Sequence, residues 1–390
     1  MRNKSGLNWK LCAVAVVMAL SACGGSGNDN DDRLRLNVVK VVGDSLSDSG
    51  TFVSIPDSAR IASVQGSGDE PNVLWVERVT KAYDLAPLCP IYQSNGYTFE
   101  PNPRSGCTNY AVAGARINYA PSIAGATESP LSVLRQLKDA GAQGFGEREL
   151  LLVDGGGNDV ADLVDAFLAA EPTDRNGPYE TLLGSLLPPG VIDEMLLLPG
   201  GPKGLGDLYM QTLADLFADT IKTHALNRGA QHVVVANIPT ITYTPRFQAV
   251  LDEIARLNGM QARPEREAIF KGWIDTFNQR LSAHFKEEPR VRVFDLAGRF
   301  TDQIHNPGKY GLSNVTLPVC GAEGISVVPY RRLNECTASA LSATTPPPGA
   351  PAGANWWQRF MFADGFPPTP YGPQRFGEQV IDLLDEVDWL

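Results

Sequence analysis

Short, nearly continuous apolar runs alternate along this chain with longer segments of helical periodicity. The apolar runs predict buried strands at residues 34–42, 150–153, 232–236 and 291–294. Between and after them, apolar residues recur at helical spacing at residues 72–83, 130–140, 159–169, 207–227, 264–285 and 373–384. This alternation predicts an α/β fold, in which helices cover both faces of a parallel sheet. We expect one domain over residues 34–390, in which the Pro/Ala-rich stretch 344–354 is a loop or lid.

The chain begins with the pattern of an export signal. Three basic residues and no acid precede an apolar stretch at residues 11–20, which is too short to span a bilayer comfortably. Leu20-Ser21-Ala22-Cys23 follows and resembles the lipobox of bacterial lipoproteins, in which residues 1–22 are removed and lipid is attached to Cys23. The alternative is an ordinary signal peptide that is cut after Ala22.

Residues 23–33 are polar, charged and rich in glycine, so they predict a flexible tether between the lipid and the domain. Gly24, rather than an aspartate, follows Cys23, and this resembles lipoproteins that are sorted to the outer membrane. The predicted location is therefore the bacterial outer membrane, with the membrane as a partner through the lipid on Cys23.

Cysteine usage agrees with export from the cytoplasm. Four cysteines lie beyond the tether, as two pairs that are each close in sequence and set in loop-like stretches. We expect disulfides Cys89–Cys107 and Cys320–Cys336, although four cysteines permit three connectivities. A zinc site is the alternative, but neither a C-x-x-C motif nor a nearby histidine supports it, so no metal site is predicted.

Composition bounds the class of protein. Hydrophobic residues make up 43% of the 390 residues and charged ones 20%, which is the balance of a globular protein with a substantial core. The formal net charge is −11 at pH 7. Because a chain this acidic is repelled by phosphate backbones, no nucleic-acid partner is predicted.

The candidate chemistry begins directly after the first predicted strand, at Gly43-Asp44-Ser45-Leu46. In open α/β sheets ligands bind beyond the carboxyl ends of the strands, so a serine on this turn is placed to act as a nucleophile. The segment is not the G-x-S-x-G turn of α/β-hydrolases, because Ser47 stands where a glycine is needed. Taken alone, it also fits an ordinary strand-to-helix turn with a Ser or Asp cap.

Three blocks in order carry a resemblance to the GDSL (SGNH) hydrolase family. Gly-Asp-Ser-Leu around Ser45 resembles the first block, residues 109–115 (NYAVAGA) the second, and residues 156–159 (GGND) the third. Residues 232–239 and 306–316 contain runs that recur in bacterial members, and the similarity covers roughly residues 38–380. The resemblance implies a flavodoxin-like, three-layer α/β/α fold with a parallel sheet of about five strands.

The resemblance also implies an activity, the hydrolysis of carboxylic esters with Ser45 as the nucleophile. The backbone N–H groups of Ser45 and Gly114 and the side-chain amide of Asn158 would hold the developing oxyanion. For Asn158, an N-cap on the helix at residues 159–169 is the alternative role. Substrates of the family are short acyl esters, lipids, acetylated sugars and polyesters, and no cofactor is implied.

The fourth block departs from the family's D-x-x-H-P-T pattern and from the Gly-His that follows it. The residues here are Asp364-Gly365-Phe366-Pro367-Pro368-Thr369 and then Gly372-Pro373. The acid, Asp364, is present, but proline occupies the histidine positions at 367 and 373. Proline has no titratable side chain, so it cannot take the proton of the serine. Removing the histidine of a serine triad costs roughly six orders of magnitude in turnover.

Four histidines lie elsewhere, namely His224, His232, His284 and His305. His224 and His284 come late in predicted helices and His232 begins a strand at the end away from the serine, so these three are predicted to be structural or surface residues. Only His305, in a loop before Asn306-Pro307, is a candidate substitute base. The sequence leaves two hypotheses, an esterase or lipase with impaired activity and an inactive scaffold that binds acyl or glycan ligands at the cell surface.

Overall fold

The computed structural model describes residues 35–55, 64–66, 72–119, 128–169, 177–321, 326–329 and 333–390. These residues all belong to one unit, Leu34–Leu390. The predicted signal peptide, the lipidation site Cys23 and the tether lie outside the described residues.

The four predicted apolar runs form one parallel sheet, in which both faces of the strands are buried. The strands are β1 (Val38–Val42), β4 (Glu149–Val153), β5 (His232–Ala236) and β6 (Val291–Phe294), in the spatial order β1-β4-β5-β6. In the register of the sheet, Val41 lies beside Leu152, which lies beside Val234. The predicted α/β class and these four strands are confirmed.

The fifth strand that the family resemblance implied is reduced to a single bridge beside β1. The N–H of Tyr110 donates to the carbonyl of Val41 at 2.7 Å, and the N–H of Val41 donates to the carbonyl of Thr108 at 3.0 Å. Between them, the N–H of Asn109 donates to the carbonyl of Cys89 at 3.2 Å, so the chain is held by a loop rather than by a longer strand pairing. The described sheet therefore has four strands.

Each predicted helical stretch overlaps an observed helix, and the structure adds α4, α5, α7, α9 and α10. The eleven α-helices of the described residues are α1 (Trp75–Ala82), α2 (Val133–Ala140), α3 (Gly157–Ala169), α4 (Pro178–Leu183), α5 (Pro189–Leu196), α6 (Gly201–His224), α7 (Pro245–Asn258), α8 (Ala262–Phe285), α9 (Leu296–His305), α10 (Ala338–Ala343) and α11 (Tyr371–Glu386). None of them is long and apolar enough to cross a membrane.

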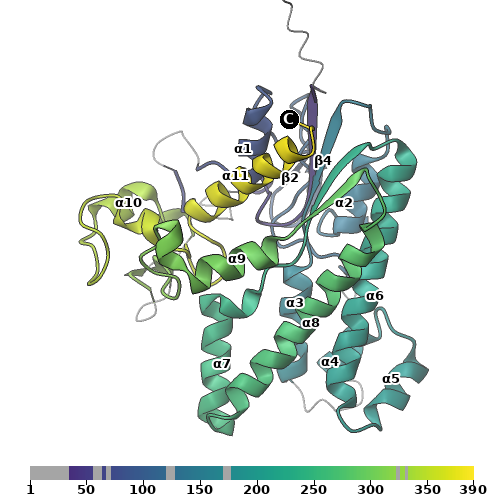
Figure 1. Cartoon of the computed structure of the whole chain (residues 1–390), viewed down its shortest axis with the longest axis vertical. Coiled ribbons are helices and arrows are strands. Elements are labelled where there is room, and N and C mark those ends of the chain that lie inside the picture. The colour runs from purple at the N-terminus through teal and green to yellow at the C-terminus, as the bar shows by residue number, and fades with distance from the viewer. Residues whose placement is uncertain are drawn as a thin grey trace, which may run out of the picture. The chain divides into compact units, whose positions relative to one another are not determined.

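The helices cover both faces of the sheet, as the alternating direction of strand side chains requires (Figure 1). On one face, Val39 and Val41 enter a core that α1 and α11 cover, and Trp75 stacks there on Phe376 with ring centroids 4.1 Å apart. On the other face, Leu151 and its neighbours enter a larger core with α2, α3, α6 and α8.

The long helices α6 and α8 lie against each other within the larger core. Gly206 of α6 lies so close to the indole of Trp273 that a Cβ at this position would overlap the ring. Phe217 and Phe277 stack farther along, with centroids 6.3 Å apart. Close approach of the two backbones therefore depends on the absence of a side chain at Gly206.

Two disulfides hold irregular segments, and both are the predicted pairs, Cys89–Cys107 and Cys320–Cys336. Each lies beside one of two small sheets, which consist of β2 (Tyr92–Ser94) with β3 (Phe99–Pro101) and of β7 (Cys320–Gly321) with β8 (Val328–Pro329). Residues 344–354 contain neither helix nor strand, so the predicted loop is confirmed.

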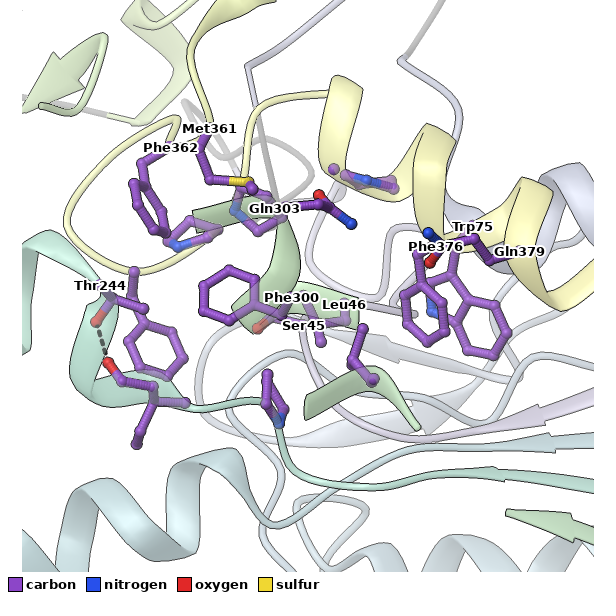
Figure 2. Close-up of a pocket in the computed structure, with 18 residues that line it drawn as sticks. Ser45, Leu46, Trp75, Thr244, Phe300, Gln303, Met361, Phe362, Phe376 and Gln379 are labelled. Atoms are coloured by element: carbon purple, nitrogen blue, oxygen red, sulfur yellow. Dashed lines mark hydrogen bonds between the residues drawn. The ribbon is translucent and has the colours of Figure 1, made fainter. Parts of the chain in front are cut away.

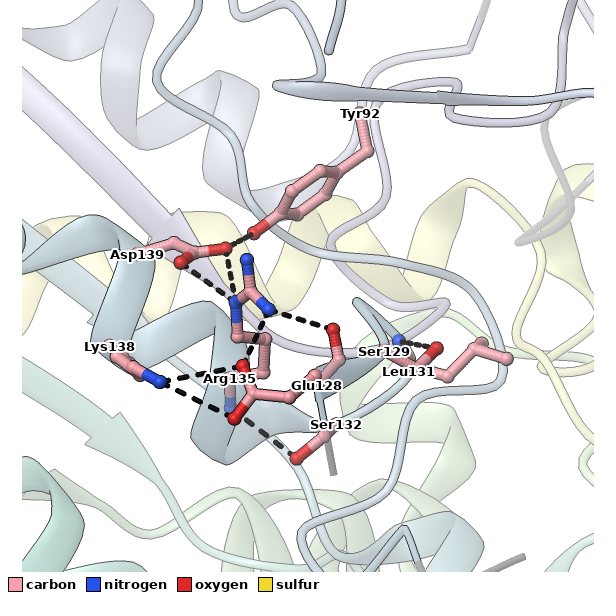
Figure 3. Close-up of polar contacts among 8 residues, drawn as sticks. All are labelled: Tyr92, Glu128, Ser129, Leu131, Ser132, Arg135, Lys138 and Asp139. Atoms are coloured by element: carbon pink, nitrogen blue, oxygen red, sulfur yellow. Dashed lines mark hydrogen bonds and ion pairs between the residues drawn. The ribbon is translucent and has the colours of Figure 1, made fainter. Parts of the chain in front are cut away.

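Arg135 of α2 anchors two further segments to that helix (Figure 3). Its guanidinium donates to both carboxylate oxygens of Asp139 and to the carboxylate of Glu128, each at 2.8 Å. Asp139 also accepts the hydroxyl of Tyr92 at 2.7 Å, and Lys138 lies 3.4 Å from Glu128. The network holds β2 and the segment at Glu128 against α2.

Candidate functional site

Ser45 lies on the turn that follows β1, at the carboxyl edge of the sheet. Gly43 allows this turn, because a Cβ there would overlap the carboxylate of Asp154 at the end of β4. The N–H of Gly43 donates to the side chain of Gln136 at 2.8 Å, which fixes the turn to α2. The Ser45 side chain is partly exposed.

Two buried aspartates and Ser47 lock the turn from beneath. The N–H of Asp44 donates to the Asp154 carboxylate at 3.0 Å. The Ser47 hydroxyl donates to the other oxygen of Asp154 and accepts the indole N–H of Trp75 at 2.9 Å. These bonds join the turn after β1 to the end of β4 and to the start of α1.

The carboxyls of Asp44 and Asp154 are both buried and lie beside each other beneath the turn. Burial, and then the neighbouring carboxylate of Asp154, raise the pKa of Asp44 well above its usual range. Burial also raises the pKa of Asp154, but hydrogen bonds from Ser47 and Asp44 act in the opposite direction. The pKa of Asp44 is therefore raised more than that of Asp154. Since Asp154 already accepts these bonds, neither carboxyl is a ready base for Ser45.

The first and second motif blocks are joined by Asp48 and Asn109. The Asp48 carboxylate accepts the N–H of Ala113 at 2.8 Å, and the Asn109 amide donates to the carbonyl of Ser47 at 2.7 Å. Gly114 follows with φ of +83°, in the left-handed region that residues with a side chain rarely adopt. The proposed oxyanion donor Gly114 is thus held on a loop that the first block positions.

Asn158 connects the third block to the second. It lies in the first turn of α3, which begins at Gly157, so it is not the N-cap of a helix that begins at Asp159. Its amide donates to the carbonyl of Ala115 at 2.9 Å, and an amide nitrogen carries a second N–H donor. Asp159 accepts the backbone N–H groups of residues 117 and 118 at 2.9 and 2.8 Å.

An apolar cavity opens beside Ser45, and we call it the Ser45 cleft. Pro367 and Pro373 line it together with the serine. Figure 2 shows Trp75 and Phe376 side by side at one end of the cleft. The empty space, counted out to the mouth, is about 790 Å³. Among the described residues that line the cleft, none has an acidic, basic, histidine, tyrosine or cysteine side chain.

A smaller recess continues from Ser45 toward the strand ends. Asp44, Asp154 and Gly157 line it with Ser45, so the carboxyl ends of β1 and β4 meet there. In the described part of the chain, neither Gly114 nor Asn158 lines the cleft or the recess, although Gly157 is the neighbour of Asn158. The structure therefore does not bring Gly114 and Asn158, the oxyanion donors implied by the resemblance, into the wall of the cleft or of the recess.

Asp364 lines a neighbouring groove rather than the Ser45 cleft. This groove also contains Arg246 and Cys320, and the Asp364 carboxylate accepts the N–H of Phe366 at 2.9 Å. Phe366 lines both the groove and the cleft, so it stands between them. The structure therefore brings position 367, but not the Asp364 side chain, to the wall of the cleft that holds Ser45.

None of the four histidines, all of which are described, lines the Ser45 cleft. His305 is the last residue of α9 rather than a loop residue, it is exposed, and its ring meets Tyr243 edge-on at 5.3 Å. His232 begins β5 at the end away from Ser45, where burial lowers its pKa. His224 ends α6, and His284 pairs with an aspartate across α6 and α8.

Sequence reasoning did not identify the buried acids or the apolar wall. Asp154 carries a detectable signal, since it is a polar residue directly after a buried strand. Trp75 lies in a predicted helix, and a buried indole usually requires a hydrogen-bond acceptor, which Ser47 supplies. Phe366 and Phe376 join the wall only through long-range packing.

The chain matches no protein-family model and no curated protein. The described residues contain no group of three or more His, Cys, Asp or Glu that could hold a metal ion. The motif residues and the geometry around Ser45 therefore carry the functional argument.

Proposed function

We propose that this chain is a carboxylic-ester hydrolase of the GDSL (SGNH) type whose turnover is slowed by proline at position 367. The observation that carries the proposal is a shared wall, because Ser45 and Pro367 line one apolar cleft at the carboxyl edge of a parallel sheet. Hydrogen bonds from Asn109 and Asn158 that join the first three motif blocks also support it.

Each part of the site has a role in the proposed reaction. The cleft receives the acyl chain, and the Ser45 hydroxyl attacks the ester carbonyl; the ester C–O bond breaks, the alcohol leaves, and water then hydrolyses the acyl-serine to the acid. The N–H groups of Ser45 and Gly114 and the second amide N–H of Asn158 stabilise the charge on the carbonyl oxygen. Because no base lines the described wall of the cleft, the serine proton passes to water, and this step limits turnover.

The proposed residual activity is small. Oxyanion stabilisation and substrate binding alone retain roughly 10³–10⁴-fold acceleration over water in serine hydrolases that lack a triad member. Asp364 would be the acid that orients an imidazole at 367, but no imidazole stands there and the carboxylate lines the neighbouring groove. A carboxylate alone is a weak base for a serine hydroxyl.

Hydrolysis of p-nitrophenyl acyl esters tests this function. We expect slow release of p-nitrophenol that Ser45→Ala abolishes and that Ser282→Ala, an exposed serine on α8, leaves unchanged. Fast turnover that is lost in Ser45→Ala and also in His305→Ala would contradict the proposal, because it would reveal a displaced base.

An inactive scaffold that binds an acyl or glycan ligand is the second candidate. The absence of ionisable side chains from the described wall of the Ser45 cleft favours it, because the wall offers apolar contact but no acid–base chemistry. Tryptophan fluorescence, to which Trp75 contributes, can measure the binding of a fatty acid. Binding of the fatty acid, with no ester hydrolysis by the chain or by Pro367→His, would favour the scaffold over the enzyme.

The location is also a proposal. We infer that the chain is exported and anchored to the bacterial outer membrane by lipid on Cys23, on the basis of the lipobox-like Leu20-Ser21-Ala22-Cys23. Mass spectrometry of membrane fractions should find a mature chain that begins at a lipid-modified Cys23. A soluble mature chain with a free thiol at this position would contradict the anchor.

A further inference from the structure

A polar groove lies on the other side of α11 from the Ser45 cleft. Pro373 and Phe376 line the cleft, whereas other residues of the first turns of α11 line the groove, as expected for two faces of one helix. We call it the arginine groove and define it by Arg78, Lys309, Arg359, Tyr371, Gln374 and Arg375.

The arginine groove concentrates positive charge in a chain whose net charge is −11. Four of its lining residues are cations, and no acidic residue of the described chain lines it. Arg375 and Lys309 are each paired with a carboxylate outside the lining, at 2.9 and 2.6 Å. Within the described residues, Arg78 and Arg359 have no carboxylate within 4 Å. Two guanidinium groups of the groove therefore form no salt bridge within the described residues.

Packing holds Arg78 in the groove although the side chain forms no salt bridge within the described residues. Its stem lies across Gly377 of α11, where a Cβ would come within 3.0 Å of it. Its Nε is buried and has no hydrogen-bond partner in the described structure. Burial lowers the pKa of Arg78, although Glu378 acts in the opposite direction. A bound anion would relieve the cost of this partly buried cation.

Arg359 is positioned by a different segment. Its Nη1 donates to the carbonyl of Gly311 at 2.9 Å. Gly311 has φ of +68°, and a Cβ there would overlap the guanidinium, so the glycine permits the close approach. A guanidinium has five N–H donors in a planar fork, and this single bond leaves donors for a ligand.

We propose that the arginine groove binds a phosphate monoester of a small polar molecule, such as a sugar phosphate. A phosphate monoester carries a charge of roughly −1.5 to −2 at pH 7, which matches two guanidinium groups without a salt bridge, whereas a carboxylate brings one charge. The 16-residue helix α11 begins at the groove, and the positive end of its dipole adds attraction for an anion.

The size of the groove accounts for the rest of the ligand. Its empty space, counted out to the mouth, is about 1070 Å³, which exceeds the need of a phosphate group alone. Gln374 and Tyr371 supply polar groups beside the cations. The binding does not depend on ester hydrolysis at Ser45, because the two cavities lie on opposite faces of α11.

Calorimetric titration of the purified full chain tests the site, with glucose 6-phosphate, inorganic phosphate and glucose as probes. We expect glucose 6-phosphate and phosphate to compete for one site, and glucose not to bind. Arg359→Gln should weaken binding of glucose 6-phosphate roughly ten- to a hundredfold, the value of a charge-assisted hydrogen-bonding group. The matched control is Arg256→Gln, an exposed arginine paired on α7, which should bind like the parent. Ser45→Ala should also bind like the parent.

Arg78→Gln should weaken binding to a similar extent, and Arg359→Gln decides alone if Arg78→Gln does not fold. If inorganic phosphate binds and glucose 6-phosphate does not, the proposal of a phosphate-monoester site is overturned, and the groove is a site for the free phosphate ion. The proposal is also overturned if neither phosphate compound binds, or if Arg359→Gln binds glucose 6-phosphate as tightly as the parent chain does.

Discussion

Replacing Asp159 by asparagine isolates the cost of one buried carboxylate at the candidate site. Asp159 is 2% exposed and accepts the backbone N–H groups of Ile117 and Asn118, which fix the third motif block to the segment after the second. Burial raises the pKa of Asp159 from 3.8 to about 6, against the opposite effect of these two donors. At pH values between 3.8 and about 6, Asp159 is therefore protonated in the folded chain but ionised in the unfolded chain.

The sign and size of the effect follow from this difference. Stability contributed by the protonated Asp159 is fully present below about pH 4 and is lost as the pH rises through about 6. The difference between 3.8 and about 6, at about 1.36 kcal/mol for each pKa unit, amounts to about 3 kcal/mol. The asparagine variant cannot titrate, so its lost acceptor costs the same amount at every pH.

Urea unfolding from pH 4 to pH 8, without reductant, measures this difference. The unfolding free energy of the parent minus that of Asp159→Asn should fall by about 2 kcal/mol between pH 4 and pH 7, because part of the full effect lies below pH 4. Asp165→Asn is the matched control, because this carboxylate lies on the same helix but with 53% of its side chain exposed. A difference for Asp159→Asn that is constant or rises with pH would refute the reasoning.

Two further predictions concern packing and covalent links. Gly206→Ala should destabilise the chain by about 1–3 kcal/mol, because the new Cβ overlaps the indole of Trp273. Gly272→Ala should instead stabilise α8 by up to about 1 kcal/mol, because a Cβ there meets nothing within 4 Å. Equal melting temperatures for the two variants would contradict the packing of α6 on α8. Joint replacement of Cys320 and Cys336 by serine should cost about 3 kcal/mol in urea unfolding, the value of a loop of this length, and an unchanged midpoint would show that the bridge does not form.

The sheet was predictable because its strands are continuous apolar runs. Residues 150–153 and 232–236 have no polar side chain other than His232, and both faces of such a run must be buried. The reduction of the expected fifth strand to one bridge was not predictable, because it depends on a long-range hydrogen bond from Asn109 to Cys89 that no local pattern encodes. Helices α5 and α7 begin at prolines. Hydrophobic periodicity alone does not distinguish a proline that starts a helix from one that interrupts it.

The candidate site was predictable to the extent that motifs place residues along the chain. Ser45 and Pro367 come to one cleft, and both positions follow from block order. Asp364 was expected in the same cleft, yet Phe366 stands between the Asp364 carboxylate and the cleft. The direction of a side chain in a loop depends on local contacts, here the hydrogen bond from the N–H of Phe366 to Asp364. The apolar wall requires stacking of Trp75 on α11, which no local pattern encodes.

The most direct test of the central claim is the kcat/KM of Pro367→His for a p-nitrophenyl acyl ester. The account predicts a gain of at least about a hundredfold over the parent, as part of the roughly six orders of magnitude that a triad histidine supplies. The gain should vanish when Ser45→Ala is added and should not appear in Pro367→Ala, which removes the ring without adding a base. Because Asp364 lies in the neighbouring groove, we expect the recovery to be partial. A Pro367→His variant that folds like the parent and hydrolyses the ester no faster would contradict the account.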